Sequence, residues 1–303
     1  MKINKHTTIF LLSECSSPVT YALKGLIRDM SRIFGQEPEV TDRTSRNQIR
    51  LQAASFDHEE EFRIQSTNDY ILIEGGNGLG LVFGIYHFCE HHLCVDPYEF
   101  WTDHPLKLQD EIDLPAFTFT SPVPKVRFRG WFINDEDCLI GWHDDMRISL
   151  ATWEQIFETL LRAGYNMIIP GTGISASDPQ LQLASEMGLW ITQHHAEPLG
   201  ASMFSDVFSG DDPAIPEDKE RFVELYKEAI AQYKDKRVIW ALGFRGQGDH
   251  SFFENDPRYD TPQKRGALIS EMVELQKNLV LQMTDSPQYF VHYLYAESAE
   301  LYH

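Results

Sequence analysis

Polar residues that could act on a sugar linkage follow four short runs typical of buried strands. They are Asn134 and Asp135 after the run 128–133, His194, His195 and Glu197 after 189–193, Arg245 and Asp249 after 238–242, and Glu297 after 288–293. Cleavage of a glycosidic bond needs a carboxylic acid that protonates the leaving oxygen and a second carboxylate that acts as base or nucleophile. Carboxyl groups at several strand ends could supply this pair.

The basic and aromatic residues of these segments could hold a substrate. Arg245 could bind a carboxylate through two parallel hydrogen bonds, or it could pair with a nearby carboxylate as part of the scaffold. Adjacent side chains of a continuing strand point in opposite directions, so only one of His194 and His195 is expected to face a site. Trp131 is a candidate aromatic wall for a sugar.

From Val126 onward, predicted strands alternate with amphipathic helices. Strands are predicted over 128–133, 166–170, 189–193, 238–242 and 288–293, and helices over 153–161, 179–187, 222–233 and 262–279. Such alternation is typical of a parallel sheet, either open or closed into a barrel. We favour the barrel because polar residues recur at successive strand ends, which converge on one mouth in that fold. A doubly wound sheet is the alternative.

The N-terminal part has a different rhythm. Residues 1–115 are predicted to form an α/β accessory domain, and residues 116–125 belong to a proline-rich stretch that suits a linker or edge strands. The remaining residues, 126–303, are too few for a complete TIM barrel, which takes about 250. The predicted fold is therefore an N-terminal α/β domain followed by the first five βα units of an incomplete TIM (β/α) barrel. We expect the chain to be part of a longer protein.

The composition argues against two classes of partner. With 46 acidic and 26 basic residues the formal net charge is −20, which repels nucleic acid and anionic membranes. No run approaches the ~20 apolar residues that span a bilayer. The apolar run Ile9–Leu12 is too short for a signal-peptide core, so a cytoplasmic location is expected. The four cysteines lack zinc-type spacing and are expected as unpaired thiols.

Two motifs resemble binding sites without matching them. The glycine-rich run Gly75–Gly80 lacks the spacing of a dinucleotide fingerprint, so a tight turn with close helix–strand packing is expected. His87, Glu90 and His91 follow the H-x-x-E-H order of an inverted zinc motif. A third ligand is not evident, and a histidine cluster on a helix surface is the favoured interpretation. Neither a cofactor nor a metal is expected.

Several motifs together resemble those of the family 115 glycoside hydrolases, which are α-glucuronidases. The matching stretches are RGWFINDE from Arg129, the segment 157–166, QHHAEP from Gln193, LGFRGQGD from Leu242, and 79–101 in the N-terminal domain. The resemblance implies an inverting hydrolase that removes glucuronic acid, or its 4-O-methyl form, from glucuronoxylan. It also implies an α/β domain before a TIM barrel, further domains, and a possible homodimer of the full-length protein.

The resemblance also implies roles for individual residues. Asp135, Asp249 and Glu297 fall where the family's site carboxylates would lie, and Glu297 is the best candidate for the acid. The implied substrate contacts are Trp131, Asn134, His194, His195, Glu197 and Arg245. The chain departs from the family where a further acidic motif, expected to supply the base, would follow.

Two other functions are open at this point. A non-catalytic or degenerate carbohydrate-binding barrel would keep Arg245 and the aromatic walls without a working carboxylate pair. A metal-dependent barrel hydrolase could instead use Asp135, His194, His195 and Asp249, because carboxylate and imidazole ligands suit zinc or manganese.

Overall fold

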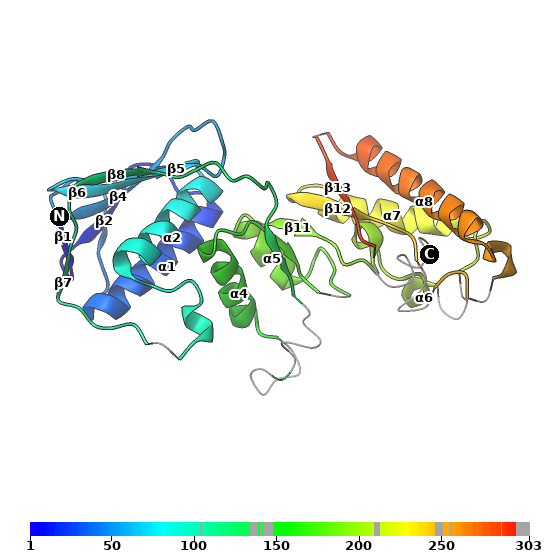
Figure 1. Ribbon diagram of the computed structural model, residues 1–303, viewed down its shortest axis with the longest axis horizontal. Helices are drawn as coiled ribbons and strands as arrows, with labels where there is room; N and C mark the ends of the chain where they lie inside the picture. The colour runs from blue at the N-terminus through cyan, green and yellow to red at the C-terminus, as the bar shows by residue number, and fades with distance from the viewer. Residues whose placement is uncertain are drawn as a thin grey trace. The chain divides into compact units, whose positions relative to one another are not determined.

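The computed structural model describes residues 1–103, 105–133, 139, 141, 148–171, 173–208, 213–245, 251–254, 256–285 and 287–294. The chain divides into two compact units. The first contains Met1–Gly130, Ala151–Asn166 and Glu186–Gly188, and the second contains Trp131–Leu150, Met167–Ser185 and Leu189–His303. Each unit has a main sheet accompanied by helices (Figure 1).

The first unit is built around a six-stranded mixed sheet. In spatial order its strands are β3 (Val40–Thr41), β2 (Thr8–Leu11), β4 (Gln48–Ala53), β6 (Tyr70–Gly75), β5 (Phe62–Ser66) and β8 (Phe117–Thr120). β2 runs parallel to β3 and β4, and β4 runs parallel to β6, whereas β5 is antiparallel to β6 and β8. The register places Leu51 opposite Ile73, so that buried side chains meet across β4 and β6. A separate antiparallel pair joins β1 (Lys2–Asn4) and β7 (Glu111–Asp113).

Helices α1 (Ser17–Phe34) and α2 (Leu79–Leu93) lie on one face of this sheet (Figure 1). α1 is amphipathic and buries a stripe that includes Val19, Leu26 and Met30. Most residues of α2 are buried, so this helix forms the centre of the unit. The 3-10 helix η1 (Glu99–Trp101) follows α2 in the chain.

The glycine-rich run between β6 and α2 is a close-packed turn, as predicted. A Cβ added at Gly75 would lie 2.5 Å from the carbonyl carbon of Gly80, and one added at Gly84 would lie 2.9 Å from Cγ2 of Ile73. Both distances are below any ordinary contact, so only glycine lets α2 approach the end of β6 this closely. The glycines therefore serve packing within the unit.

Helix α4 (Leu150–Arg162) is joined to α1 by four charged side chains, which we name the α1–α4 ion cluster: Arg28, Asp29, Glu158 and Arg162. Arg162 donates to Asp29 over 2.6 Å and to Glu158 over 2.7 Å, and Arg28 also donates to Glu158. Burial alone would raise the pKa of Glu158, but hydrogen bonds and charge from the two arginines hold it below its ordinary value.

The second unit contains a five-stranded sheet that keeps the order of the chain. Its strands are β9 (Gly130–Phe132), β10 (Met167–Ile169), β11 (Trp190–Thr192), β12 (Val238–Leu242) and β13 (Tyr289–His292). β10, β11, β12 and β13 pair in parallel. A doubly wound sheet reverses its order at a switch point, whereas here each new strand is added on the same side. The strands therefore form the arc of a TIM-type barrel, which confirms the favoured prediction.

Helices alternate with these strands in the chain. They are α5 (Pro179–Glu186), α7 (Lys219–Tyr233) and α8 (Pro262–Met283), with the shorter elements η2 (Pro198–Gly200), α6 (Phe204–Val207) and η3 (Pro257–Tyr259). α8 begins after Thr261, whose side chain accepts a hydrogen bond from the backbone N–H of Lys264 and so caps the helix. Among the described residues, no helix has both the length and the apolar run needed to cross a bilayer.

Three features of the fold differ from the sequence expectation or were absent from it. The predicted linker 116–125 contains β8, whose Phe119 pairs with Ile64, so the edge-strand alternative is the correct one. β1, β3 and β7 were not predicted because two or three residues cannot display an alternating pattern. Most of helix α4, expected among the barrel elements, belongs to the first unit, which includes Ala151–Asn166. The predicted domain boundaries themselves stay predictions.

Candidate active site at the ends of strands β11 to β13

The C-terminal ends of three parallel strands carry the described part of the predicted site. The register pairs Leu242 at the end of β12 with His292 at the end of β13. Nδ1 of His292 lies 2.7 Å from the carbonyl oxygen of Leu242. A carbonyl oxygen can only accept, so Nδ1 carries the hydrogen and Nε2 is the nitrogen left for other partners. The hydrogen bond fixes the imidazole at the strand ends.

His195 and Arg245, predicted as substrate contacts, line one small hollow at these strand ends. His292 at the end of β13 and Tyr293 directly after it complete its polar lining, and its volume is about 10 Å³, room for about one water molecule. We name it the strand-end hollow. His292 and Tyr293 were not among the predicted site residues, although both stand at the end of the predicted strand 288–293 and the same strand-end signal could have indicated them.

The prediction of opposite directions assumed that the strand continues through the two adjacent histidines, and it does not. Their ring centroids are 3.8 Å apart. Strand β11 ends at Thr192, so the alternation of a strand no longer applies at residues 194 and 195. His194 instead lies against Phe132 of β9, with ring centroids 5.3 Å apart, while His195 lines the hollow. Trp131 is the half-buried neighbour of Phe132 in β9.

Arg245 is held near the hollow by a buried support from helix α8. Its exposed fraction is 6%. Two residues earlier, the N–H of Gly243 donates to Oε1 of Gln276 over 2.9 Å, and Nε2 of Gln276 donates to the carbonyl of Gly243 over 2.7 Å. Gln276 is fully buried, so this double hydrogen bond fixes the backbone that leads into Arg245. Phe244 packs edge-on against Phe222 of α7.

Tyr293 links β13 to β11. Its hydroxyl lies 3.2 Å from Oγ1 of Thr192, a fully buried residue. Burial raises the pKa of Tyr293, and the hydrogen bond with Thr192 offsets part of that rise. Tyr293 is therefore a neutral phenol at neutral pH, able to donate or accept one hydrogen bond at the edge of the hollow.

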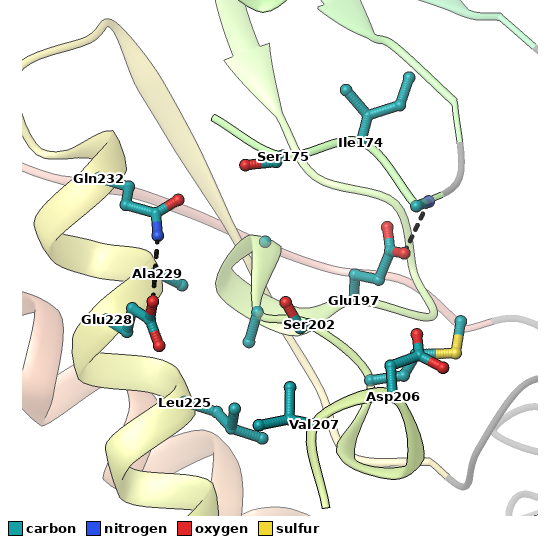
Figure 2. A pocket seen from close by; sticks show the side chains of 14 residues that line it. Ile174, Ser175, Glu197, Ser202, Asp206, Val207, Leu225, Glu228, Ala229 and Gln232 are labelled. Carbon is teal, nitrogen blue, oxygen red and sulfur yellow. Dashed lines mark hydrogen bonds between the residues drawn. The ribbon is translucent and has the colours of Figure 1, made fainter. Parts of the chain in front are cut away.

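Glu197 lines a different cavity. Its Oε1 accepts a hydrogen bond of 2.7 Å from the backbone N–H of Gly173, and the residue is 8% exposed. The cavity has a volume of about 300 Å³ and lies between the segments after β10 and β11 and helix α7 (Figure 2). Its lining does not include His195 or Arg245. The predicted role of Glu197 as a substrate contact remains a prediction.

The remaining predicted residues lie outside the described part of the chain. They are Asn134, Asp135, Asp249 and Glu297. Each follows a described strand in the sequence: β9 for the first two, β12 for Asp249 and β13 for Glu297. The assignment of the catalytic carboxylates therefore remains a prediction from the sequence.

The metal-dependent alternative gains no support from the described residues, where no group of three or more His, Cys, Asp or Glu is placed to hold an ion. Asp135 and Asp249, half of its proposed ligand set, lie outside that part of the chain. In the H-x-x-E-H motif, His87 stacks on His91 and on Phe119 of β8, with centroids 4.0 and 4.4 Å apart. These stacked rings form a histidine–aromatic cluster on α2.

Comparisons with solved structures identify similar folds. BtGH115A, described as a family GH115 4-O-methyl-alpha-glucuronidase with specificity for decorated arabinogalactans, matches with a TM-score of 0.81 at 20% identity. The match covers 100% of this chain and 44% of that chain. Two family 20 enzymes also match: the chitobiase of Flavobacterium johnsoniae (TM-score 0.57, 10% identity, 96% and 50% covered) and the β-N-acetylhexosaminidase of Streptomyces coelicolor (0.58, 13%, 96% and 63%).

These structural matches establish the fold, and the sequence comparisons establish the family. No curated protein shows significant similarity to the chain. The profile of glycosyl hydrolase family 115, in contrast, matches residues 121–303. That range covers more than half of the chain and includes the strand-end hollow, with His195, Arg245 and His292. The chain therefore belongs to glycosyl hydrolase family 115.

Proposed function

We propose that the protein of which this chain is all or part is a glycoside hydrolase that releases glucuronic acid, or its 4-O-methyl form, from polysaccharide side chains. The observation that carries this proposal is the family match over 121–303, which contains the hollow lined by His195 and Arg245. The fold match to a 4-O-methyl-alpha-glucuronidase supports it. The chain spans 44% of the length of that enzyme, so the activity of the whole protein is part of what we propose.

In this proposal, the basic side chains at the strand ends recognise the acid group of the sugar. The guanidinium of Arg245 presents parallel N–H donors that match a carboxylate. His195 shares the hollow with Arg245 and can hydrogen-bond a sugar hydroxyl or the carboxylate. Gln276 holds the backbone of Gly243, two residues before Arg245, which supports the placement of Arg245 at the strand ends.

The proposed chemistry is an inverting displacement. Glu297 is the proposed acid, which gives its proton to the glycosidic oxygen as that bond breaks. Asp135 and Asp249 are the proposed companions in the site, and a carboxylate base removes a proton from the attacking water. The product then carries the opposite anomeric configuration.

The substrate polymer and the biological setting belong to the same proposal. Glucuronoxylan is the substrate implied by the sequence motifs, and decorated arabinogalactan is the specificity given for BtGH115A. A homodimer and a cytoplasmic location are further parts of it, to be tested by light scattering and by fractionation of the source cells.

The decisive experiment is sugar release followed by proton NMR. The intact protein is incubated separately with glucuronoxylan and with a glucuronic-acid-decorated arabinogalactan. We expect release of glucuronic acid or its 4-O-methyl form, first seen as the inverted anomer. Asp249→Asn and Glu297→Gln should each lower kcat by at least about 100-fold. Absence of release from both polymers would contradict the function, and a retained anomer would contradict the inverting chemistry.

A further inference from the structure

The cavity that contains Glu197 has a lining opposite in charge to the strand-end hollow. Its polar side chains are Ser175, Glu197, Ser202, Asp206, Glu228 and Gln232. We name it the acidic cavity. None of the described residues that line it is basic. Three carboxylates without a cation repel an anionic ligand such as a uronic acid.

The acidic cavity has the size and the mixed lining of a small-ligand site. Its volume is about 300 Å³, at the lower end of the range of about 300–1,000 Å³ common for ligand pockets. Figure 2 shows Glu228 and Gln232 on α7, with Glu197 across the cavity and Ser202 between them. Carboxylates accept hydrogen bonds, and hydroxyl and amide groups both donate and accept, so this set can bind several sugar hydroxyls.

The position of the cavity connects it to the proposed site. It lies beside the segments that follow β10 and β11, at the C-terminal ends of these strands. Ala201, Ser202, Met203 and Leu225 line both the acidic cavity and a second hollow, and that second hollow is also lined by Arg245. Arg245 in turn lines the strand-end hollow. A chain of shared wall residues therefore runs from the basic hollow to the acidic cavity.

Glu197 is the fixed element of the acidic cavity. It is 8% exposed, and the N–H of Gly173 orients its carboxylate. Glu228 lies on the exposed side of α7, with its Oε1 3.5 Å from Nε2 of Gln232. A buried carboxylate and an exposed one therefore face each other across the cavity, which suits a ligand that is held by hydroxyl contacts on two sides.

We propose that the acidic cavity binds a neutral sugar of the polysaccharide, while Arg245 and His195 at the strand ends contact the carboxylate of the uronic acid. This inference rests on the proposed function, because the proposed substrate is a polymer that contains both neutral sugars and uronic acids. Charge divides the roles: Arg245 and His195 favour the acid group, whereas Glu197, Asp206 and Glu228 exclude it. The acidic cavity would then select the polymer that carries the side chain.

The test is calorimetric titration of the intact protein with oligosaccharides that contain no uronic acid, xylotriose and β-1,6-linked galactotriose. We expect at least one to bind, and Glu228→Ala to weaken that binding about tenfold, the loss of one hydrogen bond to a charged group. Glu224→Ala is the matched control, since it removes an exposed carboxylate of α7 that does not line the cavity. Its binding should equal that of the unmodified protein.

Two outcomes would overturn the inference. One is that neither trisaccharide binds, whether or not spermidine, an organic cation, binds in a Glu228-dependent way. The other is that Glu228→Ala binds the trisaccharide as tightly as the control. Release of glucuronic acid by the same preparation separates these failures from failure of the proposed function. If release persists, only the role of the acidic cavity is withdrawn.

Discussion

At the scale of single residues, neighbours in the sequence have different surroundings at the end of β11. His194 lies against the ring of Phe132, while His195 lines the strand-end hollow together with Arg245. The strand ends at Thr192, which frees the two histidines from strand alternation. His195 is therefore the better candidate for direct contact with substrate. His194 is better placed to position it, through the ring contact between them.

Arg245→Lys should test whether recognition of the substrate needs the planar guanidinium. A lysine keeps the charge but presents a point donor and loses the fork that matches a carboxylate. We expect kcat/KM for glucuronoxylan to fall about 100-fold, mainly through a higher KM. Arg221→Lys is the control, because Arg221 is a half-exposed residue of α7 that pairs with Asp218. Equal kcat/KM for the Arg245 variant and the control would remove Arg245 from the binding site.

At the scale of elements, the ion cluster ties α4 to α1. Asp29, Glu158 and Arg162 are 1%, 5% and 7% exposed, so their charges are stabilised by one another rather than by water. Arg162 also lies over the ring of Tyr86, 4.6 Å from its centroid. Removal of one member of such a cluster leaves a buried charge without compensation. The cluster is therefore a point where a single substitution weakens the first unit.

Arg162→Met should lower the free energy of unfolding of the first unit by about 3–5 kcal/mol, since Asp29 would be left buried with less countercharge. Arg32→Met is the control: Arg32 is 39% exposed in its ion pair with Glu99, and loss of such a surface pair costs about 0–1 kcal/mol. Urea denaturation followed by circular dichroism measures both variants. Equal losses of unfolding free energy in the two variants would show that burial of the cluster adds nothing to stability.

The elements could be predicted from the sequence much better than the contacts between them. The strand predicted over 238–242 agrees with β12 at both ends, because its apolar run is bounded by Arg237 and Gly243. Strand order followed from the alternation of strands and helices. The ion cluster did not, because Asp29 and Glu158 are 129 positions apart in the chain and no local pattern pairs them.

For the candidate site, too, the residues at strand ends could be predicted, whereas their contacts could not. Strand ends indicated His195 and Arg245, and the structure brings both to one hollow. The separate position of Glu197 in the acidic cavity could not be read from its neighbours, because it depends on the turn at η2, where Leu199 has φ of 62°. Asp135, Asp249 and Glu297 lie outside the described residues, so their roles still rest on the motifs around them.

At the scale of the whole molecule, family membership, fold and charge distribution support the proposal that acidic and neutral sugars bind at different places. The net charge is −20, which opposes the approach of an acidic polysaccharide. The proposed site for a uronic acid needs local positive charge, and Arg245 is the basic residue at the strand ends that would supply it. The acidic cavity, in contrast, has the same negative sign as the net charge of the molecule. The contrast explains why neutral and acidic sugars would be sorted to different places.

The stability of the first unit should depend on pH through His87. Burial first, and then the charges of His91 and His92, lower the pKa of His87 from 6.5 to about 4. Between these values the unfolded chain binds a proton that the folded state does not, so this contribution makes stability fall as the pH drops from 6.5 towards 4, with no effect above that range. His87→Gln should therefore lose less stability than the unmodified protein between pH 7 and pH 4.5. Urea midpoints at the two pH values measure the difference. His6→Gln, a substitution at an exposed position, is the control. If the pH dependence of stability is unchanged in His87→Gln, stacking on Phe119 and His91 does not keep the proton off His87.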